Sequence, residues 1–203
     1  MDRQAHWEGV YETKAETEVS WFQERPATSL ALIAATGLGP DARMVDVGGG
    51  ASRLVDHLVE KGWRSVTVLD IAAAALDRAR RRLGERANLV QWLVADVTAW
   101  SAPPSFDLWH DRAVFHFLTE PADRAAYAKT MAAAVPSGGH AIVGTFALDG
   151  PERCSGLPIQ RYDADGLAGQ FSAHFDLADA RTEDHLTPAG KVQKFQFCRL
   201  RRC

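Results

Sequence analysis

Short hydrophobic runs alternate with amphipathic segments through the middle of the chain. The runs predict strands and the amphipathic segments predict helices. Strands are expected at 44–47, 65–69, 89–95, 106–110 and 140–146. Since strands joined by helices pair in parallel with right-handed crossovers, the pattern predicts a doubly wound α/β sheet.

The expected helices lie between these strands, at 27–36, 51–61 and 72–83 and from about residue 121. The second of them has an apolar face, and Gly62 ends it. After Gly150 a short helix is expected at 163–171, and two β segments are joined by a turn at 187–190. Two strands with a short connection predict an antiparallel hairpin at the sheet edge. The fold class expected is therefore a mostly parallel seven-stranded sheet with helices on both faces and an antiparallel C-terminal hairpin.

The length favours one domain, because 203 residues with 46% hydrophobic content suit a single core, and no repeat or linker divides the chain. Within that domain, residues 1–25 are expected to form an arm over the active site. Residues 26–148 are expected to bind a cofactor, and residues 149–203 to form the acceptor side and the hairpin.

Composition narrows the classes of function. A net charge of −3 and one basic run, at 78–82, argue against a nucleic-acid partner. No apolar run reaches the roughly 20 residues that cross a bilayer. The three cysteines form no Cys-x-x-Cys pair, so neither a disulfide framework nor a metal site is expected. We therefore expect a soluble, cytoplasmic protein that is a monomer or a homodimer.

The loop after the first strand is rich in glycine. Gly48 and Gly50 allow the backbone to turn sharply and to approach a ligand. A dinucleotide-binding loop is one alternative, but Arg53 occupies the place of its third glycine. Asp46, before the glycines, is suited to hold a cation such as an α-amino group. A tight turn without a ligand is the other alternative.

Acidic residues also end the next two strands. Asp70 can accept hydrogen bonds from two ribose hydroxyls, and Asp96 can accept one from an adenine amino group. Val97 adds a backbone N–H and an apolar surface for the ring. Each aspartate alone is typical of a helix cap. Because they follow successive strands in order, together they predict a nucleoside site.

With these motifs the sequence resembles the class I, seven-stranded S-adenosylmethionine-dependent methyltransferases. The segments 45–50, 69–70, 95–97, 106–111 and 136–139 match the motifs of that family in order. The resemblance implies S-adenosylmethionine as cofactor and S-adenosylhomocysteine as product. It implies cofactor contacts from Asp46, Gly48, Gly49, Gly50, Arg53, Asp70, Ile71, Asp96, Val97 and His110.

In this fold the segment after strand four lies over the methyl group. Asp111 is therefore expected to orient an acceptor or act as its base, and His116 is a second candidate base. A hydrogen-bonded core histidine, and a structural pair of Asp111 and Arg112 with the arm, remain open alternatives. The acceptor pocket is expected to include Tyr11, Trp21, Cys154 and Arg161, although the arm aromatics could instead anchor the arm.

The predicted function is methyl transfer to an acceptor, most simply a small molecule, because the chain has little room for a substrate domain. A protein lysine methyltransferase is the alternative that Asp111 keeps open. A protein that binds S-adenosylmethionine without catalysis and a nicotinamide-dependent oxidoreductase are further alternatives. Arg53 and the terminal hairpin disfavour the last.

Overall fold

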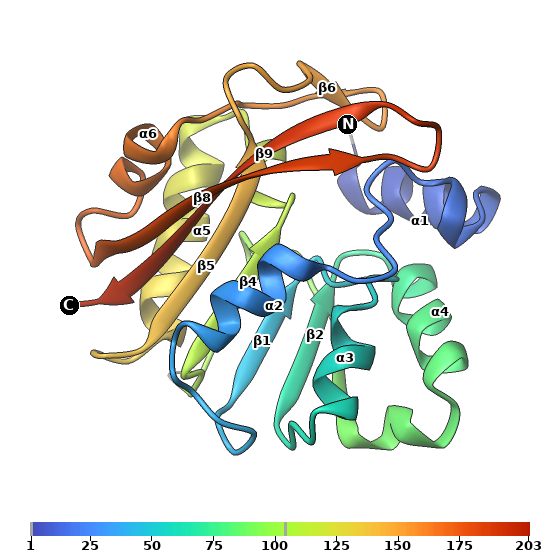
Figure 1. The fold of residues 1–203 in the computed structure, drawn as a ribbon, viewed down its shortest axis with the longest axis horizontal. Coiled ribbons are helices and arrows are strands. Elements are labelled where there is room, and N and C mark those ends of the chain that lie inside the picture. Colours follow the sequence, from blue (N-terminus) through green and yellow to red (C-terminus); the bar gives the residue numbers. More distant parts are fainter. Residues whose placement is uncertain (1, 104) are drawn as a thin grey trace.

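A seven-stranded sheet forms the centre of the computed structural model, which describes residues 2–103 and 105–203 (Figure 1). Its strand order is β3-β2-β1-β4-β5-β9-β8, and all neighbours are parallel except the pairs that β9 makes. The strands are β1 (Met44–Val47), β2 (Val66–Asp70), β3 (Val90–Val94), β4 (Leu108–Arg112), β5 (His140–Phe146), β8 (Phe175–Leu186) and β9 (Val192–Arg202). The predicted fold class is confirmed.

Helices cover both faces of this sheet, so the protein has two hydrophobic cores, one on each face. Successive residues of a strand point alternately into one core and the other. Met44 packs with α2 (Ala27–Ala34), α3 (Leu54–Glu60) and α4 (Ala73–Leu83). Its neighbour Val45 packs in the other core, with α5 (Pro121–Ala134) and α6 (Ala164–Gly169). A strand buried on both faces in this way is typical of a doubly wound sheet.

The strand order reverses between β2-β1 and β4. Since β1 pairs with β2 on one side and with β4 on the other, a crevice opens at the carboxyl ends of β1 and β4. The glycine loop after β1 and the segment after β4 both begin at this crevice, so the topology places the predicted motifs at one edge of the sheet.

Several element boundaries differ from the expectation. Strand β4 begins at Leu108 rather than Phe106, whose N–H donates to the Ala134 carbonyl instead of a neighbouring strand. Helix α3 begins at Leu54 rather than Ala51, because the turn after the glycines extends through Arg53. A 3-10 helix, η2 (Gly84–Leu89), delays the third strand to Val90.

The N-terminal segment forms α1 (Arg3–Thr13) and a short 3-10 helix, η1 (Glu16–Glu18). Helix α1 lies beyond the carboxyl ends of the strands, and the β8–β9 hairpin extends toward it (Figure 1). The His185 ring contacts the Ser20 carbonyl oxygen at 2.7 Å, which joins the hairpin to this segment. A two-stranded sheet, β6 (Arg153–Cys154) and β7 (Leu157–Pro158), follows β5. Across the described residues, none of the helices is long and apolar enough to cross a membrane.

Candidate functional site

The glycine loop after β1 is tightly packed against its neighbours. Gly48 has a φ of 66°, and a side chain there would collide with Val114. Gly50 has a φ of 36°, and an added Cβ would lie 2.6 Å from Asp70 Oδ2. The Gly48 N–H donates to the Leu69 carbonyl at 2.7 Å, which fixes the loop against the end of β2. Glycine is therefore required at both positions by conformation and by space.

The two strand-end carboxylates are held differently. Asp70 is 5% exposed, and its Oδ1 accepts the Ala72 N–H at 2.9 Å. Burial raises the pKa of Asp70 to about 7. Asp96 accepts the N–H and the hydroxyl of Thr98, at 2.9 and 2.7 Å. Each makes a local turn contact and still reaches the same cavity.

That cavity lies at the carboxyl ends of the strands and contains about 860 Å³ of space, its open mouth included. On the nucleoside side it is lined by Gly48, Leu69, Asp70, Ile71, Ala95, Asp96 and Val97. The structure thus brings together the residues expected to hold ribose and adenine.

The opposite end of the cavity is mostly aromatic, and we call it the acceptor chamber. The arm contributes Trp7, Tyr11 and Trp21 to its walls, and the end of β4 with the segment after it contributes Arg112, Ala113, Val114 and Phe117. The remaining wall residues are Phe146 of β5, Cys154 of β6 and Phe195 of β9. Trp7 packs edge-to-face on Trp21 and on Phe117, with ring centroids 5.8 and 5.0 Å apart. Walls of this kind exclude water from a bound ligand.

A second, smaller cavity lies beside the glycine loop and is lined by Gly48, Gly49, Ser52, Arg53, Asp46, His110 and Ser29, among others. Three of these side chains form a buried chain. His110 Nδ1 lies 2.7 Å from Asp46 Oδ1, and His110 Nε2 lies 2.9 Å from Ser29 Oγ. With the proton on Nδ1, His110 donates to Asp46 and accepts from Ser29. Asp46 Oδ2 has no hydrogen-bond partner within the described residues, so it is left to interact with a ligand.

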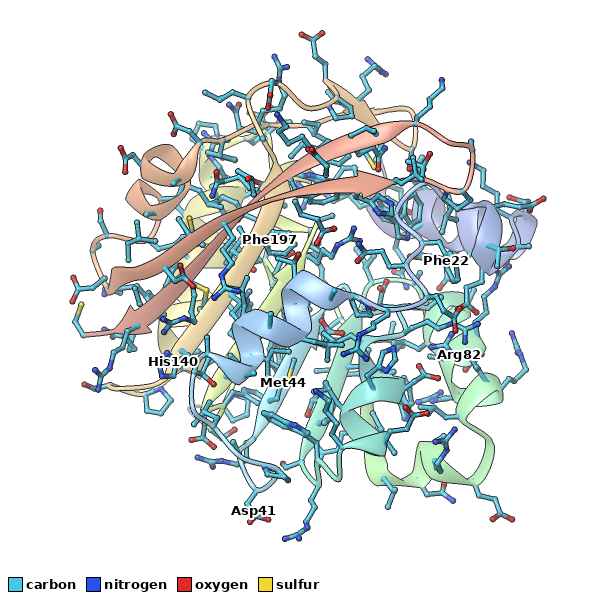
Figure 2. All side chains as sticks on the ribbon, viewed as in Figure 1. Phe22, Asp41, Met44, Arg82, His140 and Phe197 are labelled. Atoms are coloured by element: carbon cyan, nitrogen blue, oxygen red, sulfur yellow. The ribbon has the colours of Figure 1, made fainter. Side chains whose placement is uncertain are left out.

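Arg53 contacts the arm. Its Nε and Nη1 donate to Glu16 and Glu24 at 3.1 and 3.2 Å, and Glu16 also pairs with Arg82 at 3.0 Å. Figure 2 shows Arg82 and the arm residue Phe22 on the same side of the molecule. Arg53 therefore ties the arm to the helices beside the glycine loop as well as lining the second cavity.

Neither Asp111 nor His116 is among the residues that line these two cavities, so their expected role as bases gains no support from the geometry. Asp111 is fully buried and accepts hydrogen bonds from the Val114 N–H, the Phe115 N–H and the Tyr127 hydroxyl, at 2.8, 3.0 and 2.6 Å. Burial raises its pKa to about 6 despite these donors. The carboxylate caps the turn after β4 and is fully buried, away from both cavities.

His116 is a core histidine. Its Nδ1 accepts the Phe146 N–H at 3.3 Å, its ring packs on Phe117 and Phe146, and burial lowers its pKa to about 3. Asp111 lies on the face of β4 that also carries Trp109 and is packed against α5, whereas Arg112 lies on the other face and lines the chamber. Ala113, at the turn that follows, has a φ of 76°, unusual for a residue with a Cβ, and lines the cavity itself.

Of the four expected pocket residues, Tyr11, Trp21 and Cys154 line the acceptor chamber. Arg161 does not. It donates to the Gly150 carbonyl at 3.1 Å and pairs with Glu152 at 3.2 Å, so its charge is used within its own loop. The geometry therefore gives no support to the expected contact of Arg161 with the acceptor.

Arg112 and Phe195 are chamber residues that the sequence reasoning did not assign to the pocket. The Arg112 guanidinium lies 4.5 Å from the centre of the Phe195 ring, and its Nη1 donates to the Trp21 carbonyl at 3.0 Å. One of the open alternatives paired Arg112 with the arm, and this contact bears out that part of it. A charged residue at the end of a buried parallel strand was the available signal.

Helix α1 of the arm also contacts α4. Both Glu8 carboxylate oxygens accept from the first turn of α4, from the Ala73 and Ala74 N–H groups at 2.7 and 2.9 Å. Arg78 of α4 in turn donates to the Tyr11 carbonyl. Glu8 thus supplies a helix cap that Ala72, at the N-cap position, cannot make.

Comparison with known proteins agrees with this geometry. The model of a methyltransferase domain family matches residues 44–139. Nodulation protein S of Rhizobium tropici is 30% identical over 122 residues, which are 60% of this chain and 50% of that protein. The chain spans about half the length of the curated relatives that it matches.

Two solved structures share most of the fold. One, named "Conversion of a Disulfide Bond into a Thioacetal Group during Echinomycin Biosynthesis", has a TM-score of 0.78 at 20% identity and covers 98% of this chain and 92% of its own. The other is the Burkholderia thailandensis 1,6-didemethyltoxoflavin-N1-methyltransferase with bound 1,6-didemethyltoxoflavin and S-adenosylhomocysteine. It has a TM-score of 0.70 at 21% identity, and the match covers 98% of this chain and 84% of that one. Residues 44–139 therefore match a methyltransferase domain, and the strand order, the glycine loop and the strand-end aspartates are those expected of the class I S-adenosylmethionine-dependent methyltransferase fold.

Proposed function

We propose that the protein transfers the methyl group of S-adenosylmethionine to a small-molecule acceptor by direct in-line displacement. One observation carries the proposal: a single cavity joins the strand-end carboxylates Asp70 and Asp96 to an aromatic chamber under the arm. A nucleoside and a second ligand would therefore lie end to end. The toxoflavin enzyme, named with a small molecule and S-adenosylhomocysteine bound, has the same fold and supports this arrangement.

The residues present fit the cofactor. Asp70 would accept from the ribose hydroxyls, Asp96 and Val97 would contact adenine, and Asp46 Oδ2, which has no partner among the described residues and lines the second cavity, would bind the α-amino group. When bound, S-adenosylmethionine supplies a methyl group activated by a positively charged sulfur. The protein then has to align the acceptor with that methyl group and exclude water.

We assign the cap to residues 1–25. Three contacts hold this arm over the cavity: Glu8 on α4, Arg53 on Glu16 and Arg112 on the Trp21 carbonyl. With Trp7 and Trp21 in the chamber wall, the arm closes the side from which a second ligand would enter. A covered chamber suits a small molecule better than a lysine presented on a folded protein. Buried Asp111 no longer supports the lysine alternative.

Calorimetry with S-adenosylmethionine, S-adenosylhomocysteine and NAD tests the donor. Binding of both adenosyl ligands without NAD is expected, and Asp70→Ala should weaken it by at least about tenfold, since a ligand hydrogen bond to a charged group is worth about 1.5–3 kcal/mol. Asp41→Ala is the matched control, because Asp41 is exposed at the opposite end of the sheet (Figure 2). NAD binding without the adenosyl ligands would refute the proposal.

The acceptor class is tested with a methyl-labelled donor and a cell lysate. Label is expected in the small-molecule fraction after the proteins are precipitated. Label confined to protein bands would favour the lysine alternative. Binding of the donor with no transfer to either fraction would favour a protein that binds S-adenosylmethionine without catalysis.

A further inference from the structure

We propose that the acceptor is a small carboxylic acid, bound as its anion by Arg112 and methylated on oxygen without any base from the protein. This inference rests on the proposed function and names the substrate class of the same site. It is carried by two features of the acceptor chamber: one buried guanidinium with unused donors, and a wall without a usable base.

The charges around the cavity divide between its two ends. Among the described lining residues the charged side chains are Arg3, Asp70, Asp96 and Arg112. Arg3 lies 3.8 Å from Asp96 and also pairs with Asp123, so it belongs to the adenine end. Arg112 is therefore the charged group beside Phe146, Cys154 and Phe195 in the acceptor chamber, and it also lines the second cavity, with Asp46 and His110.

The guanidinium of Arg112 has donors to spare. Nη1 donates to the Trp21 carbonyl, and the nearest carboxylate oxygen, Glu183 Oε1, lies 3.6 Å from Nη2. That oxygen already accepts from Gln23 Nε2 at 2.6 Å. Arg112 Nε and Nη2 have no hydrogen-bond partner within the described residues, and the side chain is only 11% exposed.

Unpaired donors on a buried cation are costly, and a ligand oxygen that accepts from them recovers much of that cost. A guanidinium matches the planar shape of a carboxylate, which a single ammonium does not. The Phe195 ring, 4.5 Å from the Arg112 carbon Cζ, holds the guanidinium plane in place and adds an apolar surface for the body of the acceptor. These contacts favour a flat, unsaturated carboxylic acid.

Apart from Asp70 and Asp96, which the proposed function assigns to the ribose and the adenine, the wall of this cavity offers no group that could take a proton near neutral pH. Two side chains of the chamber can lose a proton to become anions, those of Tyr11 and Cys154. Burial raises the pKa of the Tyr11 hydroxyl well above its usual range and that of the Cys154 thiol to about 12, so both remain protonated. Asp111 and His116 are buried behind the turn after β4. The nucleophile must therefore arrive without a proton.

A carboxylate meets this condition, because carboxyl groups ionise near pH 4, whereas alkyl amines, alcohols and thiols keep their protons at neutral pH. In the step, a carboxylate oxygen forms a bond to the methyl carbon as the carbon–sulfur bond breaks, and the electron pair of that bond remains on sulfur. An anion and a sulfonium cation become a neutral ester and a neutral thioether. No proton moves, and no further reactant is needed.

Binding of benzoate and of benzamide to the protein saturated with S-adenosylhomocysteine tests the site directly. The two probes have the same shape and differ in charge. Calorimetry is expected to show benzoate binding at least about tenfold more tightly, which corresponds to about 1.4 kcal/mol. Equal affinities, or saturable binding by neither probe, would overturn the proposal.

Arg112→Met should remove the preference for benzoate, and Arg112→Lys should keep part of it because the charge remains. Arg64→Met is the matched control, since Arg64 pairs with Asp41 on the surface and lies outside both cavities. S-adenosylhomocysteine affinity is measured for each variant to establish that it is folded. A benzoate preference that survives in folded Arg112→Met would contradict the assignment.

The labelled small-molecule product gives an independent readout. Methyl esters release volatile methanol in mild alkali, whereas N-methyl and S-methyl groups do not. Most of the label is expected to be released, and alkali-stable label would overturn the carboxylate assignment while leaving methyl transfer intact. If S-adenosylhomocysteine does not bind at all, the proposed function itself fails, so the two failures can be distinguished.

Discussion

Replacing Asp70 by asparagine should stabilise the empty protein at alkaline pH while it weakens cofactor binding. The side chain is almost completely buried, and desolvation raises its pKa from 3.8 to about 7. The variant keeps the amide oxygen that accepts the Ala72 N–H, and it removes the charge. Asparagine has nearly the same shape, so little repacking is needed.

The magnitude follows from the two pKa values. Above pH 7 the carboxylate is charged in both states, and the folded state bears the full cost of burying it, for which about 4 kcal/mol is the upper bound, because the pKa rises from 3.8 to about 7 and one pKa unit corresponds to about 1.4 kcal/mol. As the pH falls from 7 toward 4, the folded protein takes up a proton before the unfolded chain does, so this cost declines. The asparagine variant should therefore gain about 2–4 kcal/mol at pH 8 and at most about half of that at pH 5.

Urea denaturation of the ligand-free proteins at pH 5 and pH 8 measures this difference. Asp41→Asn, in an exposed ion pair with Arg64, serves as the control and should change the free energy of unfolding by less than about 0.5 kcal/mol at either pH. A gain for Asp70→Asn that is equal at both pH values, or a loss at pH 8, would refute the desolvation argument. The buried Asp111 titrates in the same direction, but it is present in both proteins and cancels in the comparison.

Three further results are expected. Tyr127→Phe should lower the free energy of unfolding by about 2–4 kcal/mol in urea titrations, because this buried hydroxyl accepts from an indole N–H and donates to a carboxylate. The control Tyr162→Phe, whose hydroxyl has no partner among the described residues, should cost less than about 1 kcal/mol, and equal losses in the two variants would contradict this reasoning. Gly48→Ala should abolish calorimetric binding of S-adenosylhomocysteine, since the new methyl group would collide with Val114 in a backbone conformation that alanine rarely adopts, and unchanged affinity would rule out this close packing. Glu8→Ala should accelerate amide hydrogen exchange in the first turn of α4, because two backbone donors lose their acceptor there, and unchanged exchange would show that the cap is not needed.

The sequence predicted the sheet and the nucleoside side of the site because both depend on regular rules. Parallel strands end at one edge, so Asp70, Asp96 and Gly48 had to lie near one another once the strands were recognised. The hairpin was predicted equally well from two strands and a short turn, and β8 and β9 pair as expected.

The acceptor side was predicted only in part: Tyr11, Trp21 and Cys154 line the chamber, but its other residues depend on contacts between distant segments. Asp111 lies on the face of β4 opposite Arg112 and bonds to Tyr127, while His116 bonds to the Phe146 N–H in the core. Phe195 reaches the chamber from the last strand, and Arg112 contacts both it and the arm. Contacts among three segments that are distant in the sequence cannot be predicted from the spacing of residues along the chain.

The packing of Trp7 on Trp21 also gives the protein an intrinsic fluorescent probe of the cavity. Of its six tryptophans, these two belong to the arm, line the cavity and lie with ring centroids 5.8 Å apart. A planar ligand that entered the chamber, or any opening of the arm, would change the solvent exposure and mutual orientation of both indoles. Intrinsic fluorescence can therefore follow ligand entry in real time on the unlabelled protein, and single Trp-to-Phe variants would separate arm movement from direct quenching by the ligand.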